Sequence, residues 1–375
     1  MGLPLEQPRG AEQPVRSPGT PMVHPSLEKH SSASGDFARG KNSPARTVCI
    51  AGSGATRGSR IVASEDVDRA FGMPPGKLRR RAGIESLAYA AEGESELSLG
   101  TCAAREALQS AGTDAREVDW IVATSETHHN YPSMAAQLHA KLSVTENCAA
   151  LDVGGGCLGL LNAFVVAQAL VAGGQAQAVA VVSADVHSRT LLPGRVAGEF
   201  GGLFGDGASA FLLRAARPGE ASFALGEFVF GCAAQYAGAV CVSDDKEGGL
   251  TLQFDGDALS RAAISRIEKV ISAVELRSGI ARSAAGAFAT HQPNPRLMAL
   301  VAKQCGLPAS RFPEVARLSG NLGSSTCGTA LHLALQAAAN EGSAKPIFLA
   351  SLGPGLLFGG GWVEQLAGRE STRDL

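Results

Sequence analysis

Short β-branched runs alternate with Ala- and Leu-rich stretches along the chain from residue 47 onward. The segments TVCIAG, VDWIVATSE and QAVAVVSAD have the composition of buried strands, whereas LGTCAAREALQSAG carries its apolar residues at helical spacing. Such an alternation is typical of proteins in which helices cover a sheet. The pattern therefore predicts an α/β fold.

The second half of the chain repeats the pattern of the first. The segment CAALDVGGGCLGLLNAFVVAQALV is matched by EVARLSGNLGSSTCGTALHLALQAAA, and VDWIVATSETHHNYPSMAAQL is matched by AAGAFATHQPNPRLMALV. A period of about 170 residues is far too long for a solenoid. It indicates an internal duplication, with two similar α/β halves at 47–215 and 216–368 packed about a pseudo-two-fold axis.

The two ends of the chain differ from its body. Residues 1–46 are rich in Pro, Ser, Gly and charge and contain no apolar run that could form a signal-peptide core. We expect them to be a disordered extension or an upstream start-site artefact, and we expect residues 369–375 to be a C-terminal tail. No segment offers the roughly 18 uninterrupted apolar residues that a membrane span needs. The sequence therefore predicts a protein that does not enter a membrane.

Charge and cysteine usage exclude several classes of partner. The 33 Lys and Arg residues nearly balance the 35 Asp and Glu residues, and a net charge of -2 gives no global attraction to nucleic acid. The 8 cysteines are scattered, without a Cys-x-x-Cys pair or zinc-type spacing. We therefore expect a reduced, cytoplasmic protein. Three cysteines in apolar helical contexts are expected in the core: Cys102, Cys305 and Cys327.

Two further motifs do not support a ligand site. The segment GSGATRGSR at 52–60 is a glycine-rich turn after a strand, but its glycines overshoot the G-x-G-x-x-G spacing by one residue. We therefore do not expect a dinucleotide there. His128, His129 and His139 have no carboxylate at a spacing suited to a metal, so no metal site is expected either.

The duplication places three strand-to-helix joins in equivalent positions, and the first carries Cys157 in GGGCLG. A free cysteine in a tight turn is often a packed thiol. Alternatively, a helix N-terminus would lower the thiol pKa from about 8.5 towards neutrality and hold an oxyanion, which would make Cys157 a nucleophile. The glycines at 154–156 would then let a substrate approach the backbone closely.

The other two joins carry His291 and Asn321. His291 follows the apolar strand GAFAT, at the end of an α/β strand where ligands usually bind, although a lone histidine is often structural. Asn321 in SGNLGSS either tolerates a left-handed turn or donates its amide hydrogen bond to a developing negative charge. Because equivalent joins face each other across a pseudo-two-fold axis, these side chains could converge.

With Cys157, His291 and Asn321 in this order, the sequence from about 47 to 368 resembles the β-ketoacyl-acyl-carrier-protein synthase III family of the thiolase superfamily. DVGGGCLGLLNAF is similar to the segment around the family's nucleophile, HQPNPR to its His-Gln-x-Asn-x-Arg motif, and GNLGSS to its Gly-Asn turn. RAGIES, SADVHSRTL, FGDGASAFLL and GPGLLFGGGWV follow in the expected order. The resemblance implies a thiolase-like duplicated fold in a five-layered αβαβα arrangement, and a homodimer.

The resemblance also implies a catalytic triad of Cys157, His291 and Asn321. Cys157 would take an acyl group from acyl-coenzyme A, and malonyl-acyl carrier protein would then be decarboxylated to an enolate that attacks the acyl-cysteine. The product would be a β-ketoacyl thioester, in fatty-acid initiation or a specialised pathway, with no cofactor. The oxyanion hole would combine Cys157 with Gly353 or Gly355, because Pro354 has no N–H.

Four residues match family positions near the entrance for coenzyme A or the carrier protein: Arg81, Arg189, Asn294 and Arg296. Arginine suits phosphate there, although a solvated surface charge is the simpler interpretation. The chain departs from the family at Lys77, where an aromatic residue often stacks on adenine, and at Leu352, where a bulky aromatic residue often lies. Two alternatives stay open: an acyltransferase acting on an oxygen or nitrogen nucleophile without decarboxylation, and a non-catalytic subunit of a synthase complex.

Overall fold

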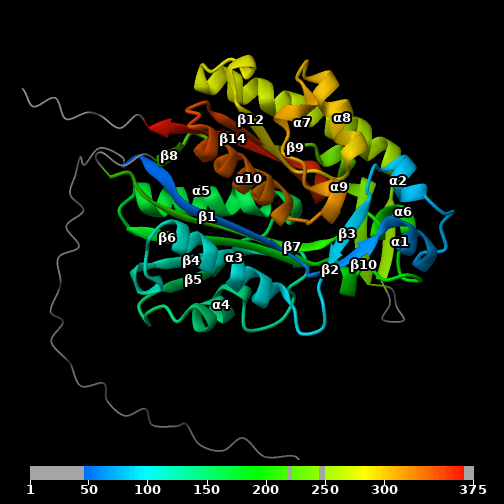
Figure 1. The fold of residues 1–375 in the computed structure, drawn as a ribbon, viewed down its shortest axis with the longest axis horizontal. Helices are drawn as coiled ribbons and strands as arrows, with labels where there is room; N and C mark the ends of the chain where they lie inside the picture. Colours follow the sequence, from blue (N-terminus) through cyan, green and yellow to red (C-terminus); the bar gives the residue numbers. More distant parts are fainter. Residues whose placement is uncertain (1–45, 218–221, 245–249, 367–375) are drawn as a thin grey trace, which may run out of the picture. The chain divides into compact units, whose positions relative to one another are not determined.

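The computed structural model describes residues 46–217, 222–244 and 250–366, and these residues belong to one compact unit (Figure 1). The expected C-terminal tail lies outside these ranges, as does the expected N-terminal extension apart from its last residue. Among the described helices, none combines the length and the apolar character that crossing a bilayer would require.

The first half of the chain builds a five-stranded sheet in the order β1-β7-β6-β4-β5. β1 and β7 are antiparallel, as are β7 and β6, whereas β6, β4 and β5 run parallel. The strands are β1 (Val48–Arg57), β4 (Trp120–Thr124), β5 (Ala149–Asp152), β6 (Ala178–Val186) and β7 (Asp206–Ala215).

The second half repeats this plan with the order β8-β14-β13-β12. Its strand directions match those of β1-β7-β6-β4, because β8, β14 and β13 alternate while β13 and β12 run parallel. The strands are β8 (Ser222–Leu225), β12 (Ala287–Thr290), β13 (Ile347–Gly353) and β14 (Leu357–Leu366). The two halves are joined where β1 pairs with β8 at Cys49 and Ile50. The predicted internal duplication is confirmed.

Helices complete five layers (Figure 1). The helices α5 (Gly159–Ala172) and α10 (Ser325–Glu341) lie between the two halves of the sheet, in a core to which strands of both halves contribute. The outer face of the first half is covered by α3 (Glu96–Ser110) and α4 (Met134–Leu142), and that of the second by α7 (Gly256–Ser278) and α8 (Pro295–Gln304). The sequence of α5 is apolar almost all round, as suits a helix that packs between two layers of sheet.

The remaining elements are short. The helices are α1 (Ser64–Ala70), α2 (Lys77–Arg81), α6 (Gly198–Gly201) and α9 (Ala316–Ser319). The strands are β2 (Arg60–Ala63), β3 (Ser86–Tyr89), β9 (Val229–Cys232), β10 (Val240–Asp244) and β11 (Leu250–Phe254). The segment that repeats β5 in sequence forms α9 instead of a strand, so the prediction of a strand before Asn321 was wrong.

Two smaller predictions were also wrong. The glycine-rich segment at 52–60 is not a turn after a strand, because β1 continues through it to Arg57. A Cβ at Gly52 would lie 2.1 Å from the carbonyl oxygen of Ala107, so this glycine lets α3 pack closely on β1. Cys102 is exposed on α3, whereas Cys305 and Cys327 are buried as predicted. The eight cysteines, all within the described ranges, form no disulfide there.

Candidate active site

Cys157 lies in a single turn of 3₁₀ helix, η2 (Gly156–Leu158), between β5 and α5. Gly155 and Gly156 have φ values of 137° and 56°, which favour glycine. A Cβ at Gly156 would lie only 2.4 Å from Pro354 Cδ. The expectation that these glycines leave clearance for substrate is therefore corrected at Gly156, where the proline of the loop after β13 fills the space.

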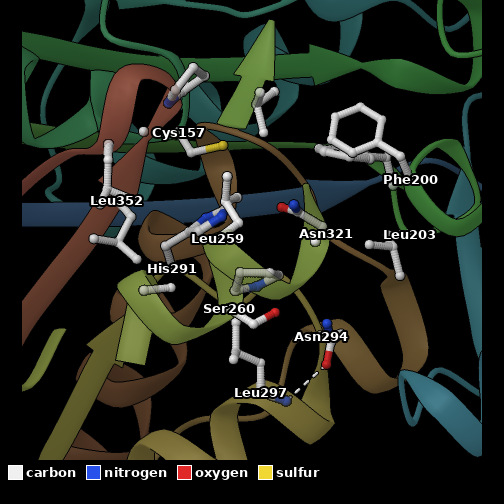
Figure 2. A pocket seen from close by; sticks show the side chains of 18 of the residues that line it. Cys157, Phe200, Leu203, Leu259, Ser260, His291, Asn294, Leu297, Asn321 and Leu352 are labelled. Atoms are coloured by element: carbon white, nitrogen blue, oxygen red, sulfur yellow. Dashed lines mark hydrogen bonds between the residues drawn. The ribbon is translucent and has the colours of Figure 1, made fainter. Parts of the chain in front are cut away.

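Cys157, His291 and Asn321 converge on one cavity of about 150 Å³ (Figure 2). The first half of the chain supplies Cys157 from the β5–α5 turn, and the second half supplies His291 from the end of β12 and Asn321 from the α9–α10 loop. Gly353 and Gly355 also line the cavity. Much of the remaining wall is apolar and includes Phe200, Leu203, Phe204, Leu259, Leu297, Leu352 and Leu356. The arrangement sets a thiol opposite two nitrogen-bearing side chains in a largely dry site.

The orientation of Asn321 is set by its neighbours. Its Oδ1 accepts hydrogen bonds from Gly323 N and Thr326 Oγ1, both at 3.0 Å. Its backbone is held against Phe204 in a parallel bridge. Because both donors hold the amide oxygen, the NH₂ group is left free to donate. The hydrogen bonds therefore favour Asn321 as a donor towards the cavity rather than as a residue that merely tolerates a turn.

His291 is buried at the carboxyl end of β12, with 4% of its surface exposed. Its backbone N–H donates to Ala350 O at 2.9 Å, which fixes the residue against β13. Burial lowers the pKa of His291 to about 4; the charge of His187 adds to this, and that of Glu126 opposes it. The ring is therefore neutral near pH 7 and carries one N–H donor.

The Cys157 thiol does not have the lowered pKa that a helix N-terminus led us to expect. Burial raises its pKa well above the usual value, and the charge of Glu126, a hydrogen bond to it and the charge of Asp185 raise it further. In this dry, acidic surrounding, the desolvation of a thiolate outweighs the favourable helix end. Cys157 is therefore a neutral thiol in the free enzyme.

Glu126, Asp185 and His187 form a largely buried charged cluster near the thiol, which no motif in the sequence predicted. His187 Nε2 lies 3.5 Å from Glu126 Oε2. Burial would lower the pKa of His187, but Glu126 and Asp185 raise it to about 9; the reciprocal contact holds the pKa of Glu126 below its usual range despite burial. Glu126 follows the carboxyl end of β4, and that position was the available signal in the sequence.

Asp185 anchors this cluster at the end of β6. It accepts hydrogen bonds from Ser125 Oγ at 3.1 Å and from Ser324 N at 2.7 Å, which tie the loop after β4 to the loop before α10. Burial, together with the charge of Glu126, raises the pKa of Asp185 to about 6. The cluster therefore links both halves of the molecule.

The two candidate glycines differ in position. Gly353 ends β13 and packs against the nucleophile turn, since a Cβ there would lie 2.5 Å from Gly155 O. Gly355 lies in the next turn with φ 77°. In the same region Ser351 Oγ donates to Cys157 O at 2.7 Å, which fixes the nucleophile's peptide.

The four residues matched to coenzyme A or carrier binding are not all at the cavity. Asn294 lines it, but its Oδ1 accepts from Leu297 N at 2.9 Å and caps α8. Arg81 and Arg296 are both exposed. They lie on adjoining elements, as shown by the hydrogen bond that Arg296 N donates to Ala82 O at 3.1 Å. Arg189 donates to Ala91 O at 2.9 Å and is not among the residues that line the cavity.

The residues singled out for other reasons have structural partners. Lys77 forms an ion pair with Glu199. His128 lies 3.1 Å from Gln137 Nε2, and His139 Nε2 lies 3.0 Å from Thr145 O. Within the described ranges, no three His, Cys, Asp or Glu residues are grouped so that they could hold a metal ion.

Comparison with known proteins places this site in a family. Residues 151–234 match the family model of 3-oxoacyl-[acyl-carrier-protein] synthase III, and residues 277–364 match the model of its C-terminal part. The chain is similar to β-ketoacyl-[acyl-carrier-protein] synthase III of Ruegeria sp. (strain TM1040), with 31% identity over 326 residues, 84% of this chain and 98% of the relative.

Solved structures agree. The fold is similar to 3-oxoacyl-(acyl carrier protein) synthase III from Pseudomonas aeruginosa, with a TM-score of 0.75 at 24% identity over 85% of this chain and 98% of that one. It is also similar to the priming β-ketosynthase of the R1128 polyketide pathway, with a TM-score of 0.76 at 25% identity over 87% of this chain and 98% of that one. These relatives do not favour the two alternative functions. The chain belongs to the β-ketoacyl-acyl-carrier-protein synthase III family of condensing enzymes.

Proposed function

We propose that this enzyme transfers an acyl group from an acyl-coenzyme A to Cys157 and then condenses it with malonyl-acyl carrier protein. The observation that carries the proposal is the convergence of Cys157, His291 and Asn321 on one buried cavity. A thiol nucleophile and two neutral N–H donors are the groups that acyl transfer followed by enolate formation requires. The reaction needs no cofactor, because both substrates arrive as activated thioesters.

In the condensation step, His291 and Asn321 would donate hydrogen bonds to the thioester carbonyl of the malonyl group. When the carboxylate leaves as carbon dioxide, the electron pair of the broken C–C bond forms an enolate whose oxygen these two donors stabilise. The enolate carbon attacks the carbonyl carbon of acyl-Cys157, and the Cys157 sulfur leaves. A neutral His291 suits this role, because it can donate without adding a buried charge.

The oxyanion hole for acylation would combine the backbone N–H of Cys157 with that of Gly353 or Gly355. Both glycines line the cavity beside the nucleophile turn, and Pro354 between them has no N–H. Loss of one such donor typically reduces the rate about 100- to 1,000-fold. The apolar wall that includes Phe204, Leu259 and Leu352 would hold the acyl chain.

Arginines near the cavity would hold the phosphates of coenzyme A or of the carrier's prosthetic arm. Arg296 is exposed two residues after Asn294, which lines the cavity, and Arg81 lies on the adjoining α2. Two exposed guanidinium groups on adjoining elements suit bidentate phosphate contacts. Arg189 is a third exposed cation of the proposed set.

We also propose a cytoplasmic homodimer. Eight cysteines without a disulfide among the described residues suit a reducing compartment. β5 is the edge strand of the first half, with Leu151 38% exposed, and Tyr131 on the loop before α4 is 97% exposed. An edge strand next to exposed apolar side chains suits pairing with a second copy. The product would enter fatty-acid biosynthesis or a specialised pathway.

Intact-mass analysis with a panel of acyl-coenzyme A thioesters tests the proposed function. Wild-type enzyme should gain one acyl group and Cys157→Ala none. Adding malonyl-acyl carrier protein should discharge the acyl group with release of carbon dioxide. An acyl adduct that survives the Cys157→Ala substitution would refute the assigned nucleophile.

A further inference from the structure

Glu126, whose side chain is 16% exposed, is a carboxylate in the wall of the cavity that the triad does not use. Its backbone N–H donates to Asp185 Oδ1, which fixes the residue at the start of the loop after β4. Its Oε2 faces His187, whereas Oε1 is buried and accepts no hydrogen bond of conventional geometry from the described residues. The residue is therefore held by two partners, while one carboxylate oxygen stays unpaired in the cavity that Cys157 also lines.

The energetic cost of burying this carboxylate indicates a role. An unpaired carboxylate in a dry cavity would be protonated, but the protonated His187 beside it keeps Glu126 ionised. The same charge makes a thiolate at Cys157 harder to form. If the carboxylate did nothing else, it would hinder an enzyme that needs a sulfur nucleophile. A carboxylate that also accepts the thiol proton would instead assist that enzyme.

The other titratable groups near the thiol are less suited to take that proton. His187 is already protonated and faces Glu126. Asp185 has its oxygens occupied by Ser125, Ser324 and the backbone N–H of Glu126. His291 is a weak base in this dry site, and the condensation step needs it as a donor. Among the described residues that line the cavity with Cys157, Glu126 is the one carboxylate, and its Oε1 is buried without a hydrogen-bond partner.

We propose, on the basis of the function proposed above, that Glu126 is the general base for acylation of Cys157. One carboxylate oxygen takes the thiol proton while the sulfur attacks the carbonyl carbon of the acyl thioester. The bond between that carbon and the donor's sulfur then breaks, and the leaving thiolate takes the proton back from Glu126. The products are acyl-Cys157 and a free thiol, and Glu126 returns to a carboxylate, so no further reactant is needed.

Glu126→Gln tests this role because it separates two properties of Cys157. Removing the negative charge makes the Cys157 thiolate easier to form. The pH at which iodoacetamide alkylates Cys157 at half its maximal rate should therefore fall, as followed on the Cys157 peptide by mass spectrometry. Removing the base should instead slow single-turnover acylation at pH 7 by about 100- to 10,000-fold, measured with the acyl-coenzyme A that acylates wild type fastest. The two rates therefore change in opposite directions.

Glu126 would be only an electrostatic neighbour, and the proposal overturned, if acylation by Glu126→Gln stayed unchanged or rose together with alkylation. Glu126→Asp keeps a carboxylate and should recover part of the lost acylation rate; a rate equal to that of Glu126→Gln would contradict the role. Glu106→Gln is the matched control, since Glu106 lies 3.6 Å from His332 outside the cavity, and both rates should match wild type. If wild type itself is not acylated, the proposed function fails and not the role of Glu126.

Discussion

Thr326 donates a hydrogen bond from its hydroxyl to Asn321 Oδ1 at 3.0 Å, and the same hydroxyl accepts one from Leu322 N at 2.8 Å. One buried side chain on α10 thereby fixes both the loop that carries Asn321 and the direction in which its amide donates. The proposed enolate donor Asn321 is thus oriented by a helix that packs in the core shared by the two halves of the molecule.

Thr326→Val should slow condensation while leaving acylation of Cys157 close to wild type. The substitution removes the hydroxyl that holds the Asn321 amide oxygen, although Gly323 N still donates to it, so the loss should be smaller than that of Asn321→Ala. For Asn321→Ala we expect about 100- to 1,000-fold. Product formation and acyl-enzyme formation are measured separately, and Thr326→Ser, which keeps the hydroxyl, is the control. Equal loss of both half-reactions would place Thr326 outside the proposed donor arrangement.

Gly156→Ala should destabilise the protein and stop acylation. The residue has φ 56°, and the added Cβ would lie 2.4 Å from Pro354 Cδ, so the nucleophile turn or the proline loop must move. We expect a loss of about 1 to 3 kcal/mol in the free energy of unfolding, measured in urea. Gly154→Ala is the matched control, because a Cβ at Gly154 meets no atom within 4 Å. Unchanged stability in Gly156→Ala would show that this contact is not tight in solution.

The His187 charge should make stability depend on pH. The folded pKa of His187 is raised to about 9 from an ordinary value of 6.5, so protonated His187 contributes stability fully below pH 6.5. That contribution is lost as the pH rises through 9. The difference in unfolding free energy between wild type and His187→Gln should therefore be constant below pH 6.5 and shrink towards pH 9.5. A difference that grows with pH would contradict the charged pair with Glu126.

Leu151→Asp should shift the protein towards a monomer, because a charge on the edge strand β5 opposes apolar pairing with a second copy. Size-exclusion chromatography with light scattering measures the mass. Leu276→Asp is the control, since Leu276 on α7 is 86% exposed, away from that edge, and its substitution should leave the mass unchanged. A wild-type protein that is already monomeric would refute the proposed dimer.

The fold could be predicted because its strands are apolar and its two halves repeat in sequence. The same repetition led to the wrong prediction of a strand before Asn321. The second half has the short helix α9 there, which is fixed by tertiary contacts rather than by the local hydrophobic pattern. The positions of Cys157, His291 and Asn321 at the cavity followed from their order along the chain. The direction in which the pKa of Cys157 is shifted could not be predicted from the sequence. Glu126 and Asp185 come near the thiol only through the packing of β4 and β6.

The charged cluster illustrates a second limit. Glu126 and His187 are 61 positions apart on different loops, and nothing in either segment announces that they meet. No role was predicted for Glu126 in TSETHH, yet it lines the cavity, where Asp185 and His187 hold it. Contacts of this kind depend on the register of neighbouring strands, which hydrophobic pattern alone does not fix.

The most direct test of the account measures both half-reactions in His291→Ala, with wild type and Cys157→Ala beside it. Intact mass reports acylation of Cys157, and carbon dioxide released from malonyl-acyl carrier protein reports condensation. We predict that wild type performs both steps, Cys157→Ala is not acylated, and His291→Ala is acylated but releases carbon dioxide at least about 100-fold more slowly. Carbon dioxide release at the wild-type rate by His291→Ala would contradict the central claim.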